Sequence, residues 1–73
     1  MQTEEIARLQ RYLREKFGNP HFRLKRRSTT DDSVEVYLGD EFIGVIYRDE
    51  DEGELSYAFQ MAILDIDLPQ TGS

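Results

Sequence analysis

The chain has 73 residues, no cysteine and one histidine, and its formal net charge at pH 7 is −6. This length indicates one domain, and the composition excludes disulfides, thiolate metal sites and histidine clusters. The first residues, "MQTEEIARLQ", lack the apolar core of a signal peptide, and no apolar run approaches the ~20 residues that cross a bilayer. We therefore expect a cytoplasmic protein that does not enter a membrane.

The charges are unevenly distributed along the chain. Residues 1–27 hold eight Lys/Arg and three Asp/Glu, whereas residues 28–73 hold one Arg and twelve Asp/Glu. This division predicts a basic end and an acidic end, unless folding interleaves the two halves. The overall negative charge argues against nucleic acids and anionic membranes as default partners.

Residues 3–17 carry the pattern of an amphipathic helix. Their apolar positions recur at spacings of three, four and four residues, which places them on one helical face: Ile6, Leu9, Leu13 and Phe17. We expect Thr3 to cap the start of this helix. Gly18, followed by Pro20, is expected to end it.

Three strands are expected next, at 21–27 ("HFRLKRR"), 33–38 ("SVEVYL") and 41–48 ("EFIGVIYR"). The first carries enough lysine and arginine to suit an edge of the sheet. Gly39 and Asp40 fit a two-residue type II′ hairpin, which would place Leu38 opposite Glu41. One sheet face should then collect Val34, Val36, Leu38, Ile43, Val45 and Tyr47, and the other should collect Tyr37, Phe42, Gly44 and Ile46.

The stretch "LSYAFQMAIL", residues 55–64, has no charge in a chain that is 33% charged. We expect it to form a fourth strand after a five-residue turn, Asp49 to Gly53, which would pair Tyr47 with Leu55. Because the single helix can cover one sheet face only, the opposite face should be left apolar and exposed, and such patches tend to be interaction sites. The residues predicted to form a partner interface there are Tyr37, Phe42, Ile46, Ala58, Ala62 and Leu64.

The expected fold is therefore α+β, with an N-terminal helix packed on a three- or four-stranded antiparallel meander sheet. Residues 1–68 should form the domain and 69–73 a frayed tail. The alternative is helix–three strands–helix, because residues 55–66 also fit helical spacing. Against that alternative, Asp65 and Asp67 would lie at a helix C-terminus, where the helix dipole disfavours them.

Three blocks, "EIARLQRYLREKFGNP", "VEVYLGDEFIGV" and "SYAFQMAILDIDL", resemble a family of short alphaproteobacterial proteins catalogued only as a domain of unknown function. The resemblance covers roughly Thr3 to Leu68. It implies a bacterial cytoplasmic protein and assigns no activity and no functional residues.

The predicted function is a non-enzymatic interaction module that forms a homodimer or docks a partner protein. The alternative is a small RNA-binding protein that grips phosphates with Arg23, Lys25, Arg26 and Arg27. The acidic turn at 49–54 departs from a calcium-loop pattern, and the Asp65–Asp67 pair has no third ligand or orienting partner. We therefore expect no catalytic residues, metal, cofactor or small-molecule substrate.

Overall fold

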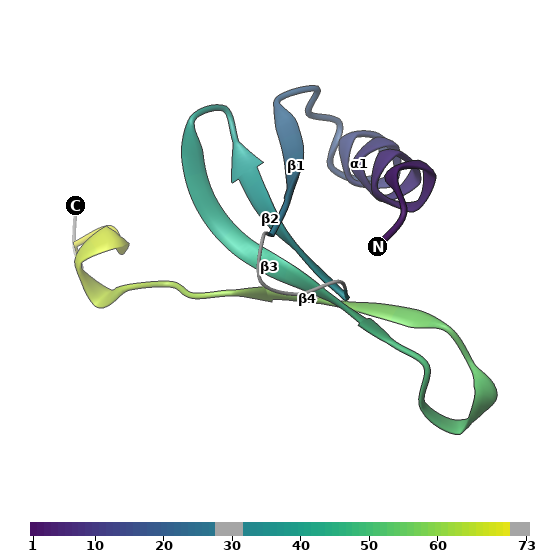
Figure 1. Ribbon diagram of the computed structural model, residues 1–73. Helices are drawn as coiled ribbons and strands as arrows, with labels where there is room; N and C mark the ends of the chain where they lie inside the picture. The colour runs from purple at the N-terminus through teal and green to yellow at the C-terminus, as the bar shows by residue number, and fades with distance from the viewer. Residues whose placement is uncertain (28–31, 71–73) are drawn as a thin grey trace.

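The computed structural model describes residues 1–27 and 32–70 (Figure 1). The chain forms one helix and a four-stranded antiparallel sheet in the order β1-β2-β3-β4, which confirms the predicted α+β meander. The elements are α1 (Thr3–Phe17), β1 (Phe22–Arg26), β2 (Ser33–Leu38), β3 (Glu41–Asp49) and β4 (Ser56–Met61), with short 3-10 turns at Asp51–Gly53 and Asp65–Asp67.

The bounds of α1 match the prediction, but its cap does not. Gln2 is the N-cap, and its backbone N–H donates to Glu5 Oε1 at 3.4 Å, so Thr3 is the first helical residue and does not cap the helix. At the other end, Gly18 adopts the left-handed conformation with φ 59°. Glycine reaches this region without steric cost, which is why the helix ends there.

The β2–β3 hairpin begins as predicted and then departs from the predicted register. Gly39 has φ 64°, and Leu38 lies opposite Glu41. A β-bulge follows, so that Val36 lies opposite Gly44 and not opposite Ile43. The extra residue in β3 reverses the faces of everything after it. The prediction was therefore wrong for four residues: Val45 and Tyr47 point away from α1, whereas Gly44 and Ile46 point toward it.

The turn between β3 and β4 is also one residue longer than predicted. Asp49 pairs with Ser56 and Tyr47 with Ala58, where the sequence had suggested Tyr47 with Leu55. Glu52 and Gly53 both have positive φ, 56° and 78°, and shape this turn. This second shift cancels the first, so Tyr57 and Phe59 lie on the helix side of the sheet.

The stretch 56–61 is a strand, which excludes the helical alternative for these residues. The predicted strand is too long, because β4 ends at Met61, not Leu64, and the chain leaves the sheet before the 3-10 turn at Asp65–Asp67. Pro69 and Gln70 belong to no element, and the rest of the expected tail lies outside the described residues.

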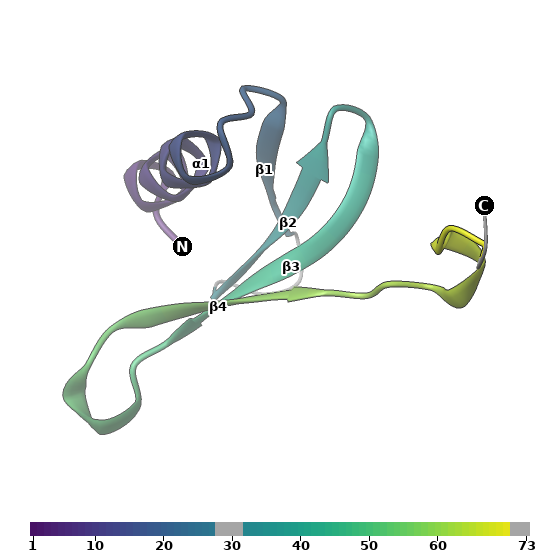
Figure 2. The same ribbon diagram turned by 180° about the vertical axis from the view of Figure 1, so that it is seen from behind.

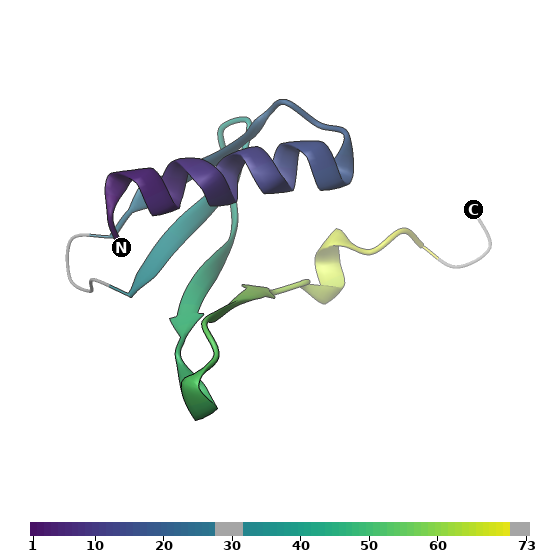
Figure 3. The ribbon, with the colours of Figure 1, turned by 90° about the vertical axis from the view of Figure 1, so that its right-hand side faces the viewer.

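The core lies between α1 and one face of the sheet. Its buried apolar residues are Met1, Leu13, Phe22, Val34, Val36 and Ile46, and Ile6, Leu9 and Phe59 are among those that pack against them. Figure 3 shows α1 across the β1–β2 side of the sheet. In Figures 1 and 2 the β3–β4 turn and the C-terminal segment extend away from this core in opposite directions.

The molecule is elongated for its size. Its extents are 47 × 26 × 24 Å and its radius of gyration is 14.1 Å, whereas a compact chain of this length has about 11 Å. Its accessible surface of 6045 Å² compares with about 4,700 Å² for a folded monomer of the same mass. No helix in the described part of the chain is long and apolar enough to span a membrane.

Candidate interaction surface

The sheet face turned away from α1 carries an exposed apolar surface. Phe42 is 52% exposed and Tyr47 is 38% exposed, and Ala58, the cross-strand neighbour of Tyr47, is also exposed. Tyr37 lies edge-on to Phe42, with ring centroids 5.7 Å apart. Its hydroxyl donates to Glu35 Oε1 at 3.0 Å, and this bond raises the pKa of Tyr37 above its ordinary value.

Three of the six predicted interface residues do not lie on this sheet face. Ile46 is 2% exposed and belongs to the core, because the bulge in β3 turns it toward α1. Tyr37, Phe42 and Ala58 lie on the far face. Ala62 and Leu64 are exposed just beyond the end of β4.

A shallow groove of about 960 Å³ joins this face to the C-terminal segment. It lies between β3 and residues 60–67, where the two segments diverge. Its lining is mostly apolar and includes Phe42, Val45, Tyr47, Met61, Ile63 and Leu64. Ile63 is 67% exposed and Leu64 is 56% exposed, so these apolar side chains face water.

The two edges of the sheet differ sharply. At the β1 edge, Gln10 Oε1 accepts a hydrogen bond from the Leu24 backbone N–H at 3.0 Å, and Arg14 Nε donates to the Phe22 carbonyl at 2.8 Å. The helix thereby occupies two of the outward backbone groups of β1. An edge with satisfied groups and charged side chains resists pairing with another strand.

The β4 edge has no such cover within residues 1–27 and 32–70. In β3, the Arg48 N–H points toward the preceding strand, because it donates to Asp32 O at 2.8 Å. Backbone direction alternates along a strand, so Tyr47 points toward β4 and bonds its partner Ala58. The outward residues of β4 are therefore Tyr57, Phe59 and Met61, each with an N–H and a carbonyl directed away from the sheet.

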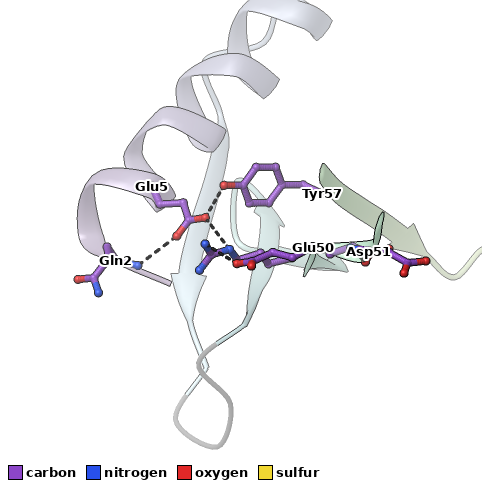
Figure 4. A network of polar contacts seen from close by, with 7 residues as sticks. Gln2, Glu5, Glu50, Asp51 and Tyr57 are labelled. Atoms are coloured by element: carbon purple, nitrogen blue, oxygen red, sulfur yellow. Dashed lines mark hydrogen bonds and ion pairs between the residues drawn. The ribbon is translucent and has the colours of Figure 1, made fainter. Parts of the chain in front are cut away.

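A polar network ties the start of α1 to β3 and β4 (Figure 4). The Tyr57 hydroxyl donates to Glu5 Oε2, and Arg48 Nε lies 3.4 Å from the same oxygen. The Arg48 guanidinium also reaches Glu50 Oε1 at 2.7 Å. Because the Glu5 side chain is only 14% exposed, this network is an internal brace between the helix and the outer hairpin.

The brace shifts the titration of its members. The Tyr57 bond lowers the pKa of Glu5 below its ordinary 4.5, with further help from the Gln2 backbone and Arg48. The same bond raises the pKa of Tyr57 above 10.0. Sequence reasoning missed this network, although one signal was available: Arg48 is the only cationic residue after position 27, and it stands in an apolar strand.

The structure divides the predicted basic cluster. Arg23 and Lys25 share the sheet face that carries Tyr37 and Glu35. Arg26 turns toward the helix, where its guanidinium donates to Met1 O and Thr3 Oγ1, both at 2.9 Å. Arg27 follows the end of β1. The four residues therefore do not form one continuous basic surface.

No group of three or more His, Cys, Asp or Glu side chains within the described ranges is placed to hold a metal ion. The acidic turn is built into the β3–β4 connection instead, where Asp49 Oδ1 accepts from the Asp51 N–H at 2.9 Å. Asp65 and Asp67 belong to the 3-10 turn after β4 and are exposed.

These features define a small α+β protein with one sheet edge partly covered by α1, one open edge and an apolar groove beside the open edge. The chain belongs to the family described as a protein of unknown function, DUF3126, which matches residues 5–67. No curated protein and no solved structure matches the chain significantly.

Proposed function

We propose that this protein is a non-enzymatic interaction module that binds protein through the apolar surface of β3, β4 and residues 62–64. The observation that carries the proposal is the groove beside Phe42 and Tyr47, whose lining includes apolar side chains that are 38% to 67% exposed. Small soluble proteins rarely keep contiguous apolar surface in water unless another molecule covers it.

The shape supports the same proposal. A compact monomer of this mass exposes about 1,300 Å² less surface than this chain does. The extra surface of this chain is larger than the about 800 Å² that each partner contributes to an interface of standard size. The proposal includes a cytoplasmic location and a bacterial source, both of which are compatible with such a module.

Phe42→Asp tests the proposal directly. Phe42 is 52% exposed and packs on Tyr37 alone among the aromatic side chains described, so the substitution should leave the fold intact and place a charge in the groove. Sedimentation equilibrium should show that the variant loses association seen in the wild type. Tyr12→Asp is the matched control, because Tyr12 is 59% exposed on α1. Equal masses for wild type and Phe42→Asp, both above that of the monomer, would place the interface elsewhere.

The alternative, RNA binding through the β1 region, has less support. The guanidinium groups of Arg26 and Arg14 form hydrogen bonds within the chain. Arg23 and Lys25 are therefore the cations of β1 that face outward. Phosphate binding would weaken linearly in log salt in proportion to the contacts made. Titration of single-stranded and duplex RNA at about 50 mM salt is the test, and absence of binding there removes this alternative.

A further inference from the structure

We propose that two copies of this chain pair their β4 strands edge to edge, antiparallel, about a two-fold axis at Phe59. This inference goes beyond the proposed function: it names a second copy of the chain as a partner at the β4 edge, a contact separate from the Phe42 face. The result is one continuous sheet with an α1 helix toward each end.

The first argument is the open edge itself. Tyr57, Phe59 and Met61 direct their N–H and carbonyl groups away from β3, as derived above from the Arg48–Asp32 bond. Proteins that keep such an edge unpaired protect it with charge, proline or a bulge. β4, "SYAFQM", has none of these, although the chain as a whole is 33% charged. At the opposite edge, Gln10 and Arg14 occupy two outward backbone groups of β1.

The second argument is the fit of the strand to itself. With Phe59 opposite Phe59 of the second copy, Tyr57 lies opposite Met61, and every outward group of β4 finds a partner. The paired residues Tyr57 to Met61 carry no charge, so no like charges face each other across the seam.

The third argument is area. Leu55, Met61 and Ile63 are 51%, 53% and 67% exposed, and they lie on or immediately beside the proposed seam. The chain exposes 6045 Å², about 1,300 Å² more than a compact monomer of its mass, so surface is available for a seam at this edge.

Hydrogen exchange of single amides tests the pairing in the full chain. In the proposed dimer the outward amides of Tyr57, Phe59 and Met61 are protected like the inward amides of Ala58 and Gln60, and their protection falls on dilution. In a monomer, or in a dimer formed through the Phe42 face, the outward three exchange at least tenfold faster than the inward two. That alternation would overturn the inference and leave the proposed function standing if the mass is still dimeric.

A pair of charge variants completes the test. Met61→Lys and Leu68→Lys add the same charge at side chains of similar exposure, 53% and 52%. Sedimentation should give wild type and Leu68→Lys twice the 8.6 kDa chain mass, and Met61→Lys should weaken the dimer at least tenfold. A wild-type chain that stays monomeric to ~1 mM, or a Met61→Lys chain as dimeric as Leu68→Lys, overturns the pairing.

Discussion

Tyr57→Phe should destabilise the protein, because it removes one hydroxyl from the brace and leaves the ring. The hydroxyl donates to the Glu5 carboxylate, which is 14% exposed. A hydrogen bond to a charged group contributes about 1.5–3 kcal/mol, so we expect a loss of about 2 kcal/mol at pH 7. For a chain of this size that is a fall in Tm of about 8–15 °C. Urea unfolding followed by circular dichroism, at fixed protein concentration, measures it.

The stability lost in Tyr57→Phe should become smaller as the pH falls. The folded-state pKa of Glu5 is lowered, so its stabilisation is complete above 4.5 and is lost as pH falls through the folded value. The difference between wild type and Tyr57→Phe should therefore shrink at acid pH. The folded-state pKa of Tyr57 is raised above 10.0, so its stabilisation is complete below pH 10 and is lost as the pH rises through the folded value. The wild type should therefore also lose stability above pH 10, where the phenol ionises.

Tyr12→Phe is the matched control, since Tyr12 is 59% exposed on α1. It should change stability by less than about 0.5 kcal/mol. If Tyr57→Phe behaves like this control at pH 7, or if its deficit is the same at pH 3 as at pH 7, the brace does not stabilise the fold as argued.

Three further predictions concern the sheet. Gly44→Ala would place a Cβ 2.4 Å from the Gln60 carbonyl oxygen, so strain should cost about 1–3 kcal/mol in urea unfolding. Ile46→Ala should lower the free energy of unfolding by about 2–5 kcal/mol, because Ile46 is 2% exposed. A loss below about 0.5 kcal/mol would mean that Ile46 lies on the exposed face after all. Gln10→Ala removes the acceptor of the Leu24 N–H, and exchange of that amide should accelerate at least tenfold while the amides of β3 stay unchanged.

The order and type of the elements followed from the sequence, because each depends on local chemistry. The apolar spacing of residues 6–17, the left-handed glycine at 18 and the Gly39 turn each act over a few residues. The four-stranded meander then follows, since short turns between strands leave few other arrangements.

The strand register could not be predicted from the sequence. It depends on one extra residue in the β3 bulge and one in the β3–β4 turn, and both are decided by packing across strands. Gly44 lets the Phe59 ring come within 2.7 Å of where a Cβ would stand, and the bulge sets this glycine opposite Val36. No local rule places that bulge. The error moved Ile46 into the predicted interface, whereas Ala58 and Phe42 were assigned correctly because the hairpin turn and the β3–β4 shift preserved their face.

The brace was missed for a related reason. Glu5 and Tyr57 are 52 positions apart, and each has an ordinary local role: a first-turn acid in α1 and an aromatic residue in a strand. Their contact depends on how far the β3–β4 hairpin leans toward the helix. That angle arises from strand twist and is not written in any short stretch of sequence.

The unequal edges of the sheet also limit how far copies can add to one another. A sheet with two open edges can accept a fresh molecule at each side, and head-to-tail addition then grows into a fibre. Here Gln10 and Arg14 occupy two of the outward groups of β1, the Leu24 N–H and the Phe22 carbonyl, so α1 hinders a neighbour's β4 from pairing there. Two side chains of one helix therefore work against growth of the sheet beyond a pair.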